Sequence, residues 1–190
     1  KFLEALPLLR ELTGNMNHME IDKVWMESVL HMQGGDGLFY MPAVGRPWAR
    51  NGLPNHSFNI DQWGVGDDGV SNHLASIVSN GILMGVVALY FAQTGDQIWD
   101  KAAKRVVDRM ADLMVYKDDY CYFPILTAIP GTKISQEDSI LDPESLAEGG
   151  GTIAGWIIHG LSQIYRSTKY QPALELAGKL AIYLMKYSGA

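Results

Sequence analysis

A short turn signature occurs three times in this chain, and each copy joins two stretches with helical patterning. The copies are Thr13-Gly14-Asn15, Thr94-Gly95-Asp96 and a degraded Ser167-Thr168-Lys169, with 81 residues from Thr13 to Thr94 and 74 from Thr94 to Thr168. This regular spacing indicates a repeated helix–turn–helix unit. Turns within units are short, whereas connections between units run from about 30 to nearly 50 residues. We therefore expect tight turns on one face of a helical stack, and long loops that carry function on the other.

The predicted helices are of two kinds, which distinguishes inner from outer positions in the stack. The first helix of the second unit is apolar on all sides from Gly81 to Ala92, and that of the third unit is similar over 153–161. A helix without a polar face must be surrounded by other protein. The second helices are amphipathic and belong at the surface. We expect inner helices near residues 80–94 and 152–167, and outer helices near 97–115 and 171–187.

The first unit shows the same one-sided pattern in a stripe formed by Ile21, Trp25, Val29 and Met32. The prediction is thus a single all-α domain over residues 1–190, built from three helical hairpins with long loops on one face. An α/α toroid and an open solenoid of hairpins both fit this alternation. Equal units stacking in one sense predict parallel inner helices, with Asn80 and Thr152 at the same end. We expect β structure only between about 118 and 130, as short strands.

The second turn carries a resemblance to a known family. Thr94-Gly95-Asp96 follows an apolar helix that ends in Tyr90-Phe91, and it precedes Trp99 and Ala102-Ala103-Lys104. This pattern resembles the hairpin repeat of the six-hairpin glycosidases, which include glycosidases, unsaturated uronyl hydrolases and sugar epimerases on α/α toroids. The resemblance covers the helical half of the chain and carries no family's catalytic motif. It implies the toroid and, by analogy, carbohydrate processing. Three hairpins are too few to close a toroid, so we expect this chain to be part of a larger barrel.

Bulk composition excludes several classes of function. The net charge of −6 and the lack of a Lys/Arg cluster argue against nucleic-acid binding. No apolar run reaches the ~20 residues that span a bilayer, so we expect no membrane association. Cys121 is the single cysteine and has no partner for an intrachain disulfide. The sequence indicates no compartment and no oligomeric state.

The connection from Gln33 to Ser79 is rich in aromatic, acidic and basic residues. Aromatic faces stack on the C–H surfaces of sugars, and planar polar groups bond to sugar hydroxyls. We therefore interpret this loop as a carbohydrate-binding segment, although the aromatics could instead pin a long loop to the domain and its Asp-Gly pairs could simply form turns. The candidate substrate-binding residues are Tyr40, Arg46, Trp48, His56, Trp63 and His73.

Two other patterns in this loop are not taken as binding motifs. Gly64-Val65-Gly66-Asp67-Asp68-Gly69 matches GxGxxG, but no strand precedes it, no helix opens at its end, and its two carboxylates would repel a pyrophosphate. Asp61, Asp67 and Asp68 lack the spacing of an EF-hand loop. We expect no metal and no cofactor.

The second long connection, from about Lys117 to Gly151, ends in Glu148 and three glycines before the predicted inner helix. At a helix N-terminus the macrodipole would stabilise the anionic form of Glu148, and the glycines would let backbone N–H groups approach a ligand. The same features also fit a flexible cap. His159 lies within the inner helix, where it is either a core histidine or part of a cavity floor.

These residues lead to three functional hypotheses. The first is a glycoside hydrolase, which needs one carboxyl as acid and another as base or nucleophile. Among the loop-face carboxyls Asp36, Asp61, Asp67, Asp68 and Glu148, we expect Asp67 or Asp68 to pair with Glu148. The second is a uronate-type lyase or sugar epimerase, in which a histidine or tyrosine acts as the base and Arg46 or Arg50 neutralises the carboxylate of the substrate. The third is a non-catalytic scaffold that presents its loop face to a protein.

Overall fold

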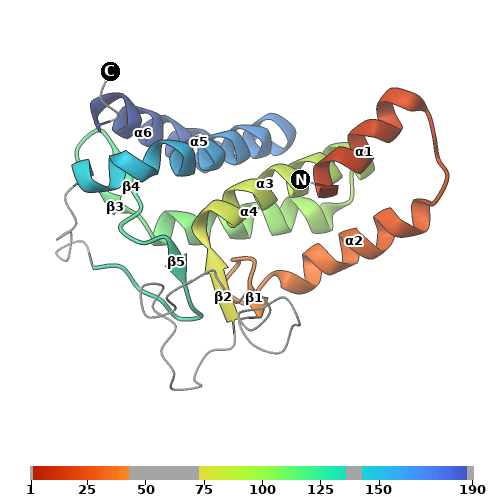
Figure 1. The fold of residues 1–190 in the computed structure, drawn as a ribbon, viewed down its shortest axis with the longest axis horizontal. Coiled ribbons are helices and arrows are strands. Elements are labelled where there is room, and N and C mark those ends of the chain that lie inside the picture. Colours follow the sequence, from red (N-terminus) through yellow and green to blue (C-terminus); the bar gives the residue numbers. More distant parts are fainter. Residues whose placement is uncertain (1, 43–72, 136–142, 188–190) are drawn as a thin grey trace, which may run out of the picture.

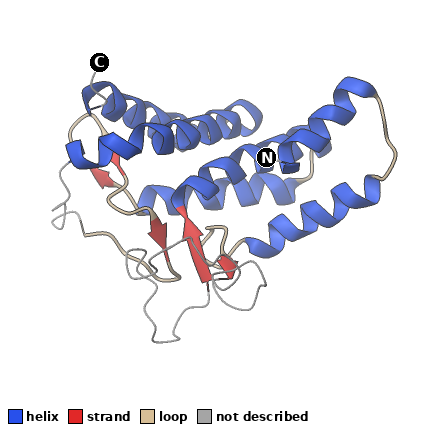
Figure 2. Cartoon of the chain, in the orientation of Figure 1, coloured by secondary structure: helices blue, strands red, loops and turns tan. Residues whose placement is uncertain are grey.

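The computed structural model describes residues 2–42, 73–135 and 143–187. Within these ranges, the side chains of Phe2, Pro42, His73 and residues 143–152 are not described. The described chain is mostly helical, which confirms the all-α prediction (Figures 1 and 2). Its helices are α1 (Phe2–Thr13), α2 (Met19–Met32), α3 (Ile77–Thr94), α4 (Gln97–Asp112), α5 (Pro143–Thr168) and α6 (Gln171–Tyr187).

The three repeated turns adopt one geometry, including the degraded copy. In each, the threonine hydroxyl donates a hydrogen bond to the carbonyl four residues earlier and accepts one from the backbone N–H two residues later. The Thr94 hydroxyl, for example, donates to the Tyr90 carbonyl at 2.7 Å and accepts from the Asp96 N–H at 3.2 Å. The next residue is left-handed in every copy, with φ of 67° at Gly14 and Gly95 and 59° at Lys169. A glycine favours this conformation, and Lys169 adopts it because the same hydrogen bonds hold it there.

The inner helices α3 and α5 pack in parallel, as the stacking argument predicts. Gly81 lies against Ile157, and further along both helices Gly85 faces His159. A β-carbon on Gly160 would lie 2.2 Å from the carbonyl oxygen of Gly81, so the two backbones are nearly in contact. α1 lies on the other flank of α3, where the Tyr90 hydroxyl donates to the Leu3 carbonyl at 3.2 Å.

Helix α3 is long and apolar enough to cross a membrane by length and composition alone. The core helix of a soluble protein passes the same test, and α3 contributes Met84, Val87 and Tyr90 to the main hydrophobic core. The expected absence of a membrane partner stays a prediction.

Short strands occur at more places than the sequence predicted. β1 (Met41–Pro42), β2 (His73–Ser76) and β5 (Thr127–Ala128) form an antiparallel sheet in the order β1-β2-β5, and β3 (Val115–Tyr116) pairs with β4 (Cys121–Tyr122). The expectation that β structure lies only between about 118 and 130 is therefore wrong. A two-residue strand has too few positions to show alternation. The pairing of Met41 with Leu74 joins the two ends of the first long loop in front of α3.

Helix α5 begins at Pro143, well before the predicted start near 152. Position 148 and the three glycines that follow it thus lie inside the helix rather than before it. Proline is favoured at the first helical position, and this signal outweighs the helix-breaking tendency of the glycine run.

The buried thiol of Cys121 is expected to be unreactive in the folded protein. Its side chain is fully buried, and burial raises its pKa from an ordinary value of about 9.0 to about 12. The thiolate fraction at pH 8 is then roughly a thousandfold smaller than in the unfolded chain. Iodoacetamide should label Cys121 rapidly in urea and very slowly without it, as measured by intact mass. Equal rates in the two conditions would contradict this environment.

Candidate functional site

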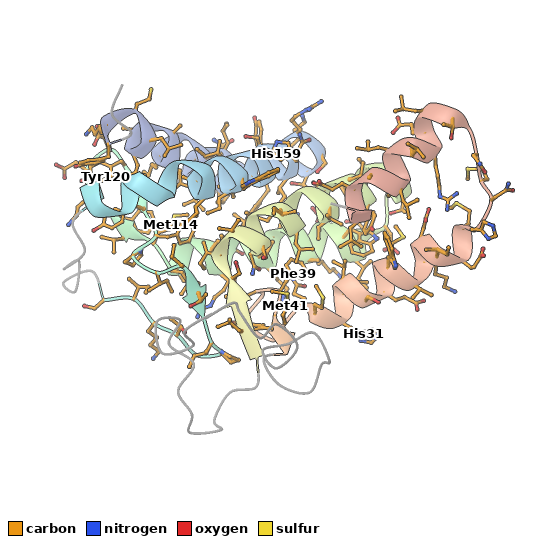
Figure 3. The ribbon with its side chains drawn as sticks, viewed as in Figure 1. His31, Phe39, Met41, Met114, Tyr120 and His159 are labelled. Carbon is orange, nitrogen blue, oxygen red and sulfur yellow. The ribbon has the colours of Figure 1, made fainter. Side chains whose placement is uncertain are left out.

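A cleft with a volume of about 770 Å³ lies where the last turns of α2 meet the start of the first long loop. Its lining includes His31, Gln33, Asp36 and Tyr40, together with the turn at Pro130–Gly131 after β5. Figure 3 shows His31 at this end of α2, with Phe39 and Met41 close by. Small-molecule sites typically occupy about 300–1,000 Å³, so the cleft is of a suitable size for a sugar.

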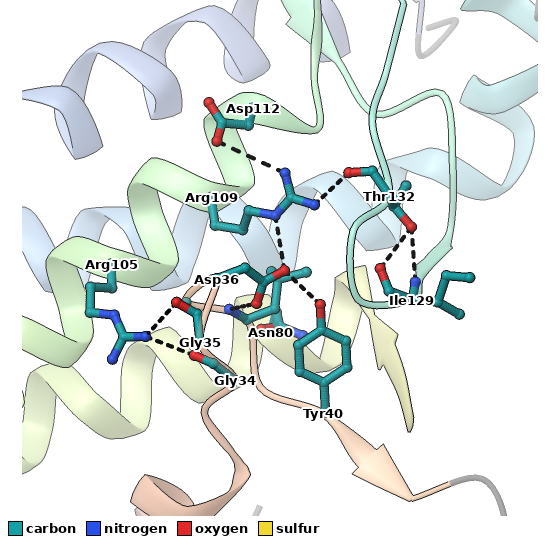
Figure 4. A network of polar contacts seen from close by, with 12 residues as sticks. Gly34, Gly35, Asp36, Tyr40, Asn80, Arg105, Arg109, Asp112, Ile129 and Thr132 are labelled. Atoms are coloured by element: carbon teal, nitrogen blue, oxygen red, sulfur yellow. Dashed lines mark hydrogen bonds and ion pairs between the residues drawn. The ribbon is translucent and has the colours of Figure 1, made fainter. Parts of the chain in front are cut away.

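One arginine of α4 joins the two loop segments that border this cleft (Figure 4). The Arg109 Nε donates to the Asp36 carboxylate at 3.1 Å, and its Nη2 donates to the carbonyl of Thr132. The Tyr40 hydroxyl donates to the same Asp36 oxygen at 2.7 Å. Side chains of Arg109 and Asp36 are 12% and 26% exposed, so this ion pair is partly shielded from water. Charge-assisted bonds of this kind fix the positions of the loops.

The same network determines what Asp36 and Tyr40 can do chemically. Burial raises the pKa of the Tyr40 phenol well above its ordinary value. The hydrogen bond to Asp36 and the negative charge of Asp36 raise this pKa further. The phenol is therefore a proton donor at neutral pH rather than a base. Asp36 is engaged by both Tyr40 and Arg109, so its carboxylate serves a structural role here.

Further contacts hold the backbone that leads into the cleft. The Asn80 side chain accepts from the Phe39 N–H at 2.8 Å and donates to the carbonyls of Phe39 at 3.0 Å and Ser76 at 2.9 Å. Arg105 donates to the carbonyls of Gly34 and Gly35 at 2.8 and 2.9 Å. α3 and α4 together thus fix residues 34–40 against the helices.

Asn80 is expected to contribute strongly to stability. Asn80→Ala removes the hydrogen-bond partners of the buried Phe39 N–H and carbonyl. Each buried polar group left without a partner costs about 1–3 kcal/mol of stability. We expect a loss of about 2–5 kcal/mol in the free energy of unfolding, measured by urea denaturation. Gln93→Ala, a truncation at an exposed position of the same helix, should change it by less than about 0.5 kcal/mol. Equal effects of the two substitutions would contradict the anchoring role.

The structure describes few of the residues predicted to form the site. Tyr40 lines the cleft, but the residue is only 7% exposed, and its role in substrate binding stays a prediction. The backbone of His73 lies in β2 and that of Glu148 in α5, while their side chains are not described. The others lie outside the described residues: Arg46, Trp48, His56, Trp63, Asp67 and Asp68.

A second groove, of about 490 Å³, crosses the inner helices on another side of α3. Glu4 of α1 and His159 of α5 both line it, and both approach Gly85, whose missing side chain leaves room for the Glu4 carboxylate. Of the two interpretations of His159, the structure favours a groove-lining residue over a core residue, because its side chain is exposed.

Sequence reasoning missed the anchoring residues Asn80, Arg105 and Arg109. The two arginines lie in a helix that the sequence analysis identified only as amphipathic, so neither stood out as an anchor. Asn80, an amide near the start of an otherwise largely apolar helix, was a signal that could have been used. Among the residues whose side chains are described, no group of three or more metal-binding side chains comes together.

Comparisons with known proteins do not identify a family. No family model matches the chain, and neither a curated protein nor a solved structure matches it.

Proposed function

We propose that this protein binds and processes carbohydrate, as a glycoside hydrolase built on an α/α toroid. The observation that carries the proposal is the parallel packing of α3 on α5. Because the two long loops run into the N-terminal ends of these two helices, parallel packing brings the loop ends to the same end of the stack. A carboxyl from the first long loop and one from the first turns of α5 would then lie at the same end of the stack, as glycosidic hydrolysis requires.

The described part of the long-loop end has features that suit a sugar ligand. His31, Gln33 and Tyr40 line the cleft around a volume that a small saccharide can fill. Arg105, Arg109 and Asn80 hold its backbone in place. A cleft whose backbone is held in place lowers the ordering cost of binding a ligand.

In this proposal Glu148 supplies one catalytic carboxyl, and either Asp67 or Asp68 supplies the other. Asp36 is a poor candidate because Arg109 and Tyr40 engage its carboxylate. Trp48 and Trp63 form the stacking platform beside Tyr40. Hydrogen bonds to sugar hydroxyls come from Arg46, His56 and His73. No metal or cofactor takes part.

The test is a screen of the purified protein against a panel of neutral and uronate-containing oligosaccharides. Hydrolysis releases a new reducing end and adds one water to the product mass for each bond cleaved. A lyase would cleave without adding water and leave an unsaturated uronate, and an epimerase would change the sugar without cleavage. If no member of the panel is bound or altered, the enzyme proposal fails and the non-catalytic scaffold replaces it.

A further inference from the structure

The second groove is bordered by α1 on one side of α3 and by α5 on the other (Figure 1). Its volume of about 490 Å³ is within the range of small-molecule sites. Charged side chains enter it from both borders, whereas α3 supplies only small or apolar residues. We call it the inner-helix groove and define it by six of its lining residues: Glu4, Gly85, Leu89, His159, Gln163 and Arg166.

The acidic and basic side chains lie at different levels along this groove. The β-carbon that Gly85 lacks would lie 2.8 Å from the Glu4 carboxylate and 4.0 Å from the His159 ring, so these two side chains share one level. Arg166 follows His159 by seven residues, or two turns, on the same face of α5. At a rise of 1.5 Å per residue, Arg166 is about 10 Å further along the groove.

Neither charged end of the groove is neutralised by the described part of the chain. Within those residues the Glu4 carboxylate makes no hydrogen bond or ion pair, and the Arg166 guanidinium makes none either. The two groups do not pair with each other although they line the same groove. The groove therefore presents a negative charge at one end and a positive charge at the other, and both are available to a ligand.

The level between the two charges is largely apolar. Leu8 of α1 and Ala88 and Leu89 of α3 line it. Such a surface favours methylene groups and gives no hydrogen-bond partner to a hydroxyl. Gln163, three residues before Arg166, adds an amide donor next to the guanidinium. This pattern differs from the polar lining that a sugar requires.

We propose that the inner-helix groove binds an elongated zwitterion, with an amine at one end, a carboxylate at the other and an apolar chain between them. The ammonium donates to the Glu4 carboxylate and to an acceptor nitrogen of neutral His159. The ligand carboxylate accepts from Arg166, whose guanidinium geometry matches a carboxylate. The methylene chain covers the apolar level of the groove. The inference does not depend on carbohydrate binding at the long-loop end.

The test measures the dissociation constant of 6-aminohexanoate by isothermal titration calorimetry on the full chain. Hexanoate lacks the amine and hexylamine lacks the carboxylate, so these two compounds are the matched single-charge probes. We expect 6-aminohexanoate to bind about tenfold more tightly than either one, or better, because each single-charge probe loses a charge-assisted hydrogen bond.

Three substitutions assign each end of the ligand to its side chain. Glu4→Gln should weaken the binding of 6-aminohexanoate and hexylamine about tenfold and leave that of hexanoate unchanged. Arg166→Gln should weaken the binding of 6-aminohexanoate and hexanoate by a similar factor and leave that of hexylamine unchanged. Gly85→Ala places a methyl group 2.8 Å from the Glu4 carboxylate and displaces it, so this variant should behave like Glu4→Gln.

Controls separate this site from general effects of charge and fold. Glu11→Gln and Lys101→Gln each remove a charge at an exposed position outside the groove, and both should leave all three dissociation constants unchanged. Circular dichroism checks that every variant is folded. The proposal is overturned if the wild-type protein does not bind 6-aminohexanoate at millimolar concentrations, or binds it no more tightly than the single-charge probes. Unchanged affinity in Glu4→Gln or in Arg166→Gln also overturns it, because the ligand then does not bridge the two charges.

Discussion

Gly160→Ala is expected to destabilise the protein by about 3 kcal/mol, a large effect for the addition of one methyl group. The new β-carbon would lie 2.2 Å from the Gly81 carbonyl oxygen and 2.9 Å from the Met84 β-carbon. The first of these atoms belongs to the backbone, so no flexible side chain can move aside. α3 and α5 would have to separate, and the apolar contacts on both sides of Gly160 would weaken. Urea denaturation should show a lower midpoint with an unchanged slope.

Gly155→Ala is the matched control, because it makes the same change one and a half turns earlier in the same helix. No atom lies within 4 Å of the β-carbon that it adds. Alanine is the better helix former, so this substitution should stabilise the protein by about 0.5–1 kcal/mol. If Gly160→Ala proves as stable as Gly155→Ala, the close parallel contact of α3 and α5 is wrong.

Glu148→Gln is expected to lower kcat on a cleaved glycan by about 10²–10⁴-fold, the usual contribution of an acid–base carboxyl. The amide keeps the size of the side chain and removes its ability to give up or take a proton. Of Asp67→Asn and Asp68→Asn, we expect one to produce a comparable loss and the other little change. Turnover is measured as reducing ends released per enzyme under saturating substrate.

Glu175→Gln, the same chemical change at an exposed position of α6, should leave kcat unchanged. Glycan binding by each inactive variant, measured calorimetrically, separates a loss of chemistry from a loss of affinity. Full turnover in the variants at positions 67, 68 and 148 would exclude these residues from catalysis.

The helical repeat could be predicted from the sequence because its signals are local and periodic. Thr13, Thr94 and Thr168 make the same two hydrogen bonds, so a turn recognised in the best copy also located the degraded one. The parallel arrangement followed from stacking equal units. The glycines at 81 and 160 gave no such signal, because their role depends on which helices come into contact.

The described part of the candidate site was harder to predict. Asp36 looked like a free loop carboxylate, whereas its partner Arg109 is 73 residues away in the chain and occupies the polar face of a surface helix. Such a pair is created by tertiary packing and leaves no spacing pattern in the sequence. The early start of α5 was missed because three consecutive glycines normally end a helix.

Hydrogen–deuterium exchange with and without a bound glycan tests the central claim, that carbohydrate binds at the long-loop end. We predict slower exchange in the presence of the glycan for peptides that cover residues 33–42, the Pro130–Gly131 turn and the first two turns of α5. Peptides from the turns at Gly14, Gly95 and Lys169, at the opposite end of the helix stack, should exchange at the same rate in both conditions. Protection confined to those turns or to α1 would contradict the account.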